Sequence, residues 1–248
     1  MKKLSKRSVF RIVWFSLVGI FMVWNIGTYQ SRNLPSDTFE NSEKVSVQET
    51  KDQIIFKSNL TNKSLEVIFF QGALVDPKAY APLCRKLAEA GFTTHLIKTP
   101  FRLPLYGYQK ISEIFDLEKG NYVIGGHSQG GKMAARFVFE NPEILKGLFL
   151  LGTSHPRDID LSNLTIPSLK LYGEFDGLAS VEEVEANESK LPKGCRSIMI
   201  EGGNHSQFGY IGTLLTDNRA GIPLEKQQEL TLSHLKVFLN GIEKSLLK

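Results

Sequence analysis

The chain contains little cysteine. Its 248 residues include only Cys84 and Cys195. Neither belongs to a Cys-x-x-Cys pair or to a spacing typical of metal ligands, so the sequence gives no sign of a metal site. We expect both thiols to be packed as small apolar side chains. A disulfide between them in an exported domain stays an open alternative, because the sequence does not reveal how far apart they lie.

Acidic residues are absent from residues 1–31, which carry five Lys and Arg residues. If these five basic residues are left out, 25 basic residues remain against 26 acidic ones. The net charge of +4 therefore comes from the amino end. The near-neutral remainder offers no basic surface for nucleic acid. A hydrophobic content of 42% and 21 glycines are typical of a globular α/β protein and not of a disordered one.

The basic residues Lys2, Lys3, Lys6, Arg7 and Arg11 precede an apolar run at residues 12–26. Extended to residue 28, the run reaches the minimum of about 17 residues for a bilayer span. A basic flank stays in the cytoplasm, which predicts that the rest of the chain is outside.

The run lacks an Ala-x-Ala-like cleavage site, and no cysteine follows it as a lipid attachment site would require. We therefore expect residues 1–28 to be an uncleaved signal-anchor that crosses the cell membrane once. Secretion after cleavage is the alternative. Residues 29–50 are polar and predict a linker, and residues 51–248 predict one folded domain.

Strand-like apolar segments alternate with helical patterns through that domain, and no internal repeat is present. This order predicts an α/β fold, a mainly parallel sheet with helices on both faces. The segment 152–167 is too short for a large cap domain. The expected strands lie at 65–70, 92–97, 122–124, 145–151, 168–172 and 196–200, the helices at 76–90, 111–117, 132–139, 182–191 and 227–239, and a leading hairpin at 44–48 and 53–56.

A Gly-x-Ser-x-Gly motif stands between the 122–124 strand and the 132–139 helix, as Gly126-His127-Ser128-Gln129-Gly130. In this context the motif predicts a strained strand-to-helix turn that exposes the serine hydroxyl at the edge of the sheet. Glycines are needed two residues to either side, because a Cβ would collide with neighbouring backbone. We therefore expect Ser128 to be a nucleophile.

A serine nucleophile needs a base, and functional groups collect beyond the carboxyl ends of parallel strands. His205 directly follows the last strand in a glycine-rich loop, and His155 follows an earlier one. His205 is the preferred base, with His155 as the alternative. His127 is too close to Ser128 along the chain to turn back onto it.

The base needs an orienting acid, and Asp176 lies between glycines just past the 168–172 strand. Asp158 and Asp160 are the rivals, past the preceding strand. The order Ser128, Asp176, His205 is the one expected for an α/β-hydrolase.

Two backbone N–H groups must bind the oxyanion of the tetrahedral intermediate. One belongs to Gln129, directly after the serine. The other comes from the loop that follows the 65–70 strand, where Ala73 is preferred and Leu74 is next.

Four blocks of the sequence resemble the α/β-hydrolase superfamily over about residues 50–245: Gln71–Leu83, Gly125–Gly131, Tyr172–Ala179 and Glu201–Tyr210. The chain is most similar to a small, lidless bacterial group of serine-esterase-like proteins, and the resemblance implies the triad Ser128, Asp176 and His205. It also resembles dienelactone-hydrolase-like proteins in lacking a large cap. Those carry a cysteine nucleophile, so their substrate does not transfer to this chain.

The sequence thus predicts a membrane-anchored serine hydrolase that cleaves small or medium carboxylic esters, or lipid-derived acyl groups, through an acyl-serine. No metal or organic cofactor is expected. The side chains expected to line the substrate pocket are Leu74, Phe101, Tyr106 and Phe208. Two alternatives stay open: acyl transfer to an alcohol or sugar, and a non-catalytic binding protein on a hydrolase scaffold. The oligomeric state does not follow from the sequence.

Overall fold

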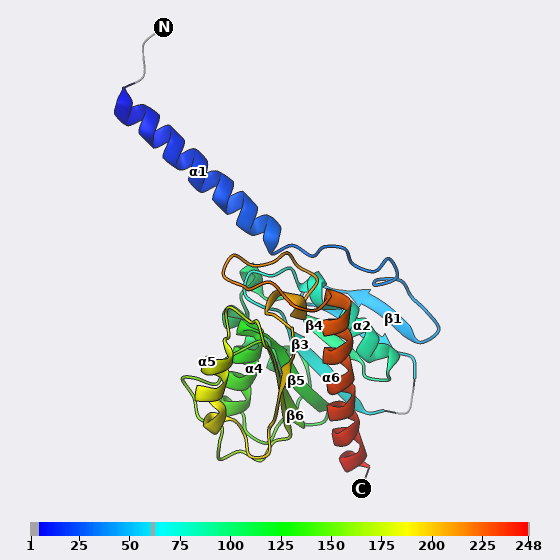
Figure 1. Ribbon diagram of the computed structural model, residues 1–248. Coiled ribbons are helices and arrows are strands. Elements are labelled where there is room, and N and C mark those ends of the chain that lie inside the picture. The colour runs from blue at the N-terminus through cyan, green and yellow to red at the C-terminus, as the bar shows by residue number, and fades with distance from the viewer. Residues whose placement is uncertain (1–4, 61–62, 248) are drawn as a thin grey trace.

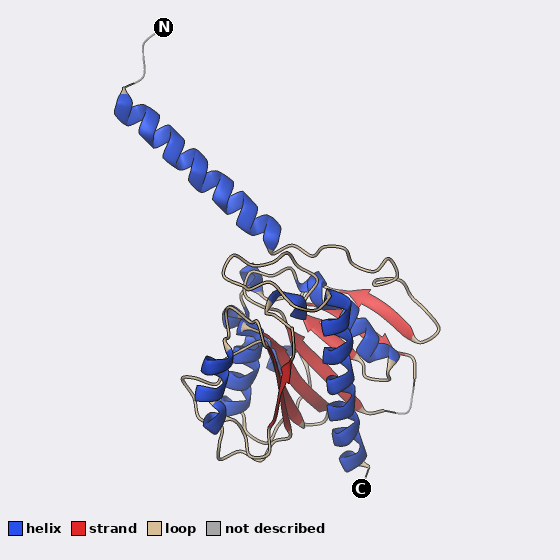
Figure 2. Ribbon diagram, in the orientation of Figure 1, coloured by secondary structure: helices blue, strands red, loops and turns tan. Residues whose placement is uncertain are grey.

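An eight-stranded sheet forms the centre of the domain in the computed structural model, which describes residues 5–60 and 63–247. Its spatial order is β1-β2-β4-β3-β5-β6-β7-β8. Figure 2 shows the strands in red with helices beside them. The strands are β1 (Val45–Glu49), β2 (Gln53–Ser58), β3 (Leu65–Phe70), β4 (Thr94–Ile97), β5 (Asn121–His127), β6 (Gly147–Leu151), β7 (Ser168–Gly173) and β8 (Arg196–Ile200).

The pairing is antiparallel between β1 and β2 and between β2 and β4, and parallel from β4 through β3 to β8. The expected leading hairpin is therefore β1–β2, and it forms one edge of the sheet. The predicted α/β architecture with a mainly parallel sheet is confirmed. The central strands are buried on both faces, which explains why β3 and β6 are almost continuously apolar.

Helices cover both faces of the sheet and produce two apolar cores. α2 (Ala81–Glu89) and α6 (Leu224–Leu246) pack on one face, and α3 (Ile111–Ile114) and α4 (Gln129–Glu140) on the other. α5 (Val181–Ala186) contacts β7. Short 3₁₀ helices complete the loops: η1 (Pro77–Tyr80), η2 (Pro100–Arg102), η3 (Pro104–Tyr106), η4 (Tyr108–Lys110), η5 (Glu188–Lys190) and η6 (Ser206–Phe208).

Several expected helices differ in length from the observed ones. The 76–90 helix begins as the 3₁₀ turn η1, where the Asp76 carboxylate accepts a hydrogen bond from the Lys78 N–H. The 111–117 helix ends at Ile114, because Phe115 is extended. The 182–191 helix is divided into α5 and η5, and α6 is longer than expected at both ends.

The amino-terminal helix α1 (Lys6–Thr28) projects away from the domain (Figure 1). Its stretch from Lys6 to Trp24 is long and apolar enough to cross a membrane, and none of it is buried. A signal sequence has the same properties, so the structure shows an apolar helix and leaves its anchoring role to be tested. Lys2 and Lys3 lie outside the described residues.

The polar segment after α1 lies against the domain. Thr38 is buried, and its carbonyl and that of Glu40 accept hydrogen bonds from Arg85 Nη1, at 3.5 and 2.5 Å. The ring of Phe39 packs beside that of Phe56. The segment 29–50 also contains β1, so it contributes a strand to the sheet as well as a connection.

Both cysteines are free thiols, as expected for packed side chains. Cys84 is fully buried on α2, and Cys195 is partly buried before β8. Burial raises the pKa of Cys195 to about 12, which keeps this thiol protonated at neutral pH.

Candidate active site

Ser128 occupies a sharp turn between β5 and α4. Its backbone angles are φ 54° and ψ −120°, a strained conformation for a residue with a side chain. A Cβ added at Gly126 would lie 2.3 Å from the Phe70 carbonyl oxygen, and one at Gly130 would lie 2.4 Å from the Gln71 oxygen. These two glycines therefore permit the close approach of α4 to the end of β3 that the turn requires.

The loop after β3 supplies backbone N–H groups close to this turn. The Gly72 N–H donates to the Tyr80 hydroxyl at 3.1 Å, and the Leu74 N–H donates to the Arg102 carbonyl at 2.7 Å. Within the described part of the chain, the N–H groups of Ala73 and Gln129 have no protein acceptor. These two residues are the expected oxyanion donors, and Leu74, the alternative, already has a partner.

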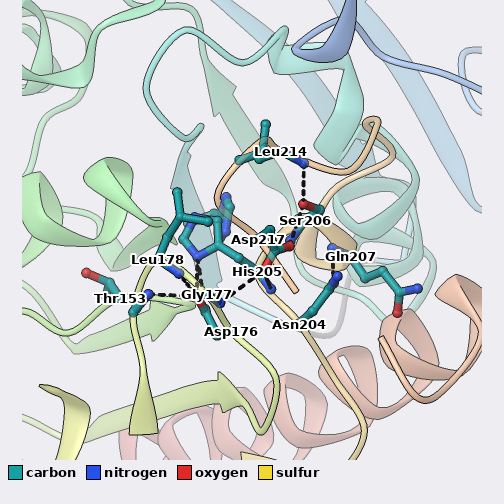
Figure 3. A network of polar contacts seen from close by, with 12 residues as sticks. Thr153, Asp176, Gly177, Leu178, Asn204, His205, Ser206, Gln207, Leu214 and Asp217 are labelled. Carbon is teal, nitrogen blue, oxygen red and sulfur yellow. Dashed lines mark hydrogen bonds and ion pairs between the residues drawn. The ribbon is translucent and has the colours of Figure 1, made fainter. Parts of the chain in front are cut away.

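Asp176 and His205 form a buried pair. His205 Nδ1 lies 2.9 and 3.0 Å from the two Asp176 carboxylate oxygens, and both side chains are almost completely shielded from solvent (Figure 3). Asp176 Oδ1 also accepts the N–H groups of Leu178 and Ala179, at 2.9 and 2.7 Å. The carboxylate is thereby fixed so that it can select the tautomer with a proton on His205 Nδ1.

His205 lies beside the serine turn. Its ring centroid is 4.4 Å from that of His127, the residue directly before Ser128. No hydrogen bond joins the Ser128 hydroxyl to the imidazole among the described residues. Such bonds often tighten only when substrate is bound.

Asp217 connects the loops that carry the acid and the base. Its carboxylate accepts the Gly177 N–H at 3.1 Å, next to Asp176, and the N–H of Ser206 at 2.7 Å, next to His205 (Figure 3). It also accepts the Ser206 hydroxyl at 2.5 Å. Sequence reasoning missed this residue, because it stands in an irregular segment between η6 and α6 without a motif around it.

α6 holds the same loop from the other side. Gln227 Oε1 accepts the Asn204 N–H at 3.0 Å, and Gln227 Nε2 donates to the Asn204 carbonyl at 2.8 Å. Both partners are buried. This pair of bonds fixes the backbone immediately before His205.

Tyr80 joins the oxyanion loop to the serine turn. Its hydroxyl accepts the Gly72 N–H and lies 2.7 Å from His127 Nδ1. Burial holds the pKa of His127 well below its usual range, and the nearby His205 lowers this pKa further. The His127 ring is therefore neutral. Because the Tyr80 oxygen already accepts one bond, its proton is available for His127 Nδ1.

A family model described as "Alpha/beta hydrolase family" matches residues 66–229, which include all of these groups. The chain belongs to the alpha/beta hydrolase family. A comparison with curated proteins finds no match.

Several solved structures have the same fold. In each of the three described below, the comparison covers at least 98% of the neighbour's chain. A soluble variant of monoglyceride lipase from Saccharomyces cerevisiae is 10% identical, covers 86% of this chain and 99% of its own, and has a TM-score of 0.62. Est1E from Butyrivibrio proteoclasticus is 15% identical over 79% and 99% of the two chains, with a TM-score of 0.55. An alpha-beta serine hydrolase homologue from Coxiella burnetii is 14% identical over 79% and 98%, with a TM-score of 0.56. At these identities the likeness shows the fold alone.

His155, the alternative base of this alpha/beta hydrolase, lies beside Asp158 and Lys132. His155 Nδ1 is 3.5 Å from Asp158, and that carboxylate is also 3.2 Å from Lys132 Nζ. Burial, with Lys132 as the next cause, lowers the pKa of His155 to about 4. Asp160 is tied to the Ser162 N–H. His155, Asp158 and Lys132 line a cavity of about 220 Å³ along the side of α4.

The four expected pocket residues divide into two groups. Leu74, Phe101 and Tyr106 are exposed on the loops after β3 and β4. Phe208 is fully buried, with its ring centroid 5.6 Å from that of His127. Phe208 therefore supports His127 from within the core. Among the described residues, no three His, Cys, Asp or Glu side chains gather as a metal site requires.

Proposed function

We propose that this alpha/beta hydrolase is a serine hydrolase of carboxylic esters, with Ser128 as nucleophile, His205 as general base and Asp176 as the acid that orients it. The observation that carries the proposal is the buried Asp176–His205 pair beside the strained turn at Ser128. A serine in that conformation next to a carboxylate-oriented imidazole is the arrangement that acyl transfer needs. The lipase and the serine hydrolase homologue among the structural neighbours are consistent with it.

In the proposed reaction, His205 Nε2 removes the proton of Ser128 Oγ as this oxygen attacks the acyl carbon. The N–H groups of Ala73 and Gln129 donate to the developing oxyanion. The alcohol then leaves with the proton from His205, and an acyl-serine remains. Water, deprotonated by the same imidazole, releases the acid. The Asp176 carboxylate stabilises the imidazolium that forms on His205.

The proposal extends to the organisation of the chain. Residues 1–28 anchor the protein in the cell membrane as a single pass. Residues 29–50 link this anchor to residues 51–248, which form the catalytic domain outside the cytoplasm. The unburied apolar stretch of α1 and the basic residues before it support this topology. Secretion after cleavage is distinguished by the mass of the protein recovered from cell membranes.

The test is labelling of the purified full chain with a fluorophosphonate, followed by intact-mass measurement. We expect a single adduct that Ser128→Ala removes and that Ser245→Ala, near the carboxyl end of α6, retains. Retained ester turnover in folded Ser128→Ala would contradict the proposal. Competing alcohols in the turnover assay separate hydrolysis from acyl transfer, and an unlabelled, folded protein would indicate a binding protein.

A further inference from the structure

The end of α1 is fixed to the loop that carries His205. The Gly212 N–H donates to the Thr28 carbonyl at 3.1 Å, and the Arg32 N–H donates to the Tyr210 carbonyl at 2.8 Å. Thr28 is the last residue of α1 and is buried. In Figure 1 the helix leaves the domain beside the orange loops that follow β8. The helix thus joins the domain at the site itself, without a free tether.

The opposite side of the site holds the next residues of the same segment. The Asp76 N–H donates to the Tyr29 carbonyl at 2.9 Å, and Arg102 Nη2 donates to Gln30 Oε1 at 3.2 Å. The Arg102 carbonyl in turn accepts the N–H of Leu74. Residues 28–32 therefore lie between the His205 loop and the oxyanion loop.

The distance from the bilayer to this junction is short. The membrane-spanning stretch ends at Trp24, four residues before Thr28. Four helical residues rise about 6 Å, and the headgroup layer on each side of a bilayer is about 5–8 Å thick. Trp24 suits the boundary between these layers. The junction thus lies at headgroup depth, and this spacing leaves no room for a folded protein between the domain and the lipid.

Exposed apolar side chains stand on the loops that follow β3, β4 and β8, at the carboxyl edge of the sheet. We name Leu74, Phe101, Leu105, Tyr106 and Leu215 the apolar rim. The exposed fractions of these residues range from 49% for Leu74 to 83% for Phe101. Leu74 and Phe101 have positive φ values of 63° and 53°, which are unusual for bulky residues and show that the backbone is constrained there. Exposed apolar side chains on one edge of a domain are typical of a contact surface.

We propose that the apolar rim rests in the outer leaflet of the membrane that holds α1, and that the substrate is an acyl ester of a membrane lipid that enters the site from the bilayer. The catalytic part rests on the proposed ester hydrolysis, while the docking of the rim rests only on α1 and the rim. The guanidinium groups of Arg32 and Arg102, close to the junction, match the anionic headgroups of such a surface. The chemical steps are those of the proposed reaction, with the lipid alcohol as leaving group.

The catalytic test uses the full chain in vesicles that contain phosphatidylglycerol and diacylglycerol, with p-nitrophenyl butyrate as a water-soluble ester. The variant is Leu215→Ser, and the matched control is Leu247→Ser, an exposed leucine directly after α6. The carboxyl end of α6 lies on the side of the domain away from α1 (Figure 1). Removing one anchored leucine should lower diacylglycerol hydrolysis about tenfold, with butyrate hydrolysis unchanged. Equal loss of both activities, or no loss of either, would overturn the proposal.

A second variant releases the site from the membrane without altering the rim. Twelve Gly and Ser residues inserted between Gly27 and Thr28 leave the contacts of Thr28 with the domain in place. We expect hydrolysis of diacylglycerol in the vesicle to fall severalfold and hydrolysis of butyrate to stay constant. Unchanged diacylglycerol hydrolysis would show that the position of the site at the bilayer has no role.

A third measurement does not depend on catalysis. In a Cys195→Ser background, Leu215→Cys and Leu247→Cys are labelled with an environment-sensitive dye in the same vesicles. We expect a blue shift at residue 215 and none at residue 247. Equal spectra would overturn the docking, even if esters are hydrolysed. A shift at residue 215 in a protein that hydrolyses no ester would instead reject the proposed activity and retain the docking.

Discussion

At the scale of single residues, Tyr80 links two parts of the site that must hold their relative positions. Its hydroxyl contacts the Gly72 N–H in the oxyanion loop and His127 in the serine turn. The residue itself is fully buried between Phe69 and His127. The hydroxyl therefore fixes the loop that contains Ala73 relative to the turn at Ser128.

We expect Tyr80→Phe to lower kcat for ester hydrolysis about tenfold or more, with little change in KM, because small misplacements of catalytic groups are costly. Steady-state kinetics with p-nitrophenyl butyrate measure both constants. Tyr122→Phe, at the opposite end of β5, is the control. A rise in KM alone would show that the hydroxyl serves substrate binding instead.

At the scale of elements, the approach of α4 to the end of β3 determines whether the turn at Ser128 can form. A Cβ at Gly130 would meet the carbonyl oxygens of Phe70 and Gln71, both at 2.4 Å. Backbone atoms cannot move aside as a flexible side chain does. The helix and strand must therefore separate if this position gains a methyl group.

We expect Gly130→Ala to lower the free energy of unfolding by about 2 kcal/mol and to abolish fluorophosphonate labelling. Gly241→Ala on α6 is the matched control, since its Cβ would meet nothing within 4 Å. That change should raise the free energy of unfolding by about 0.5–1 kcal/mol. Urea unfolding followed by circular dichroism measures both. Normal labelling of Gly130→Ala would contradict the packing described here.

β7 carries a buried amine. Lys170 Nζ donates to the His155 carbonyl at 3.1 Å, and burial lowers the pKa of Lys170 to about 8. Between pH 8 and pH 10.5 the folded protein has released this proton, whereas the unfolded chain still binds it. The free energy of unfolding therefore rises with pH in this range and is lowest below pH 8.

We expect the free energy of unfolding of the wild type, relative to Lys170→Met, to increase by about 3 kcal/mol from pH 8 to pH 10.5. Comparison with the variant cancels the titration of the other lysines. Urea unfolding at several pH values gives the difference. A difference that is constant with pH would show that Lys170 keeps its proton in the folded state.

At the scale of the whole molecule, the segment after α1 belongs to the folded body. Arg85 is almost completely buried, and its guanidinium donates to the carbonyls of Thr38 and Glu40. Removal of residues 28–44 would leave this charge without those acceptors and would uncover Phe56.

We expect a chain that begins at residue 28 to unfold at a Tm close to that of the full protein in detergent. A chain that begins at residue 45 should be less stable by about 2 kcal/mol, because Arg85 keeps its ion pair with Glu89 but loses two carbonyl acceptors. Thermal unfolding of both measures the difference. Equal Tm values would show that the segment is a linker only.

The sequence predicts the site best where the chemistry is local. The turn at Ser128 is predictable from the sequence because Gly126 and Gly130 indicate a close approach between α4 and the end of β3 that only glycine permits. Asp176 and His205 are found because each follows a strand at the carboxyl edge of the sheet. The mainly parallel sheet follows from the alternation of apolar strands and helices.

Contacts through irregular segments are not readable in the same way. Asp217 accepts N–H groups from two loops, yet nothing in its neighbourhood distinguishes it from a turn aspartate. The polar composition of residues 29–50 predicts a linker, whereas its hydrogen bonds with Arg85 are made by backbone carbonyls, which every residue has. The connection of α1 to Gly212 depends likewise on backbone atoms.

The carboxylate of Asp217 has a consequence for how the site loses its structure. Because one side chain fastens both the loop after β7 and the loop after β8, neither can open without releasing the other. The amides of Gly177 and Ser206 should exchange with deuterium at the same rate, as one cooperative unit. Under mild denaturation the acid and the base would then be lost together, so that inactivation is a single event that precedes unfolding of the sheet.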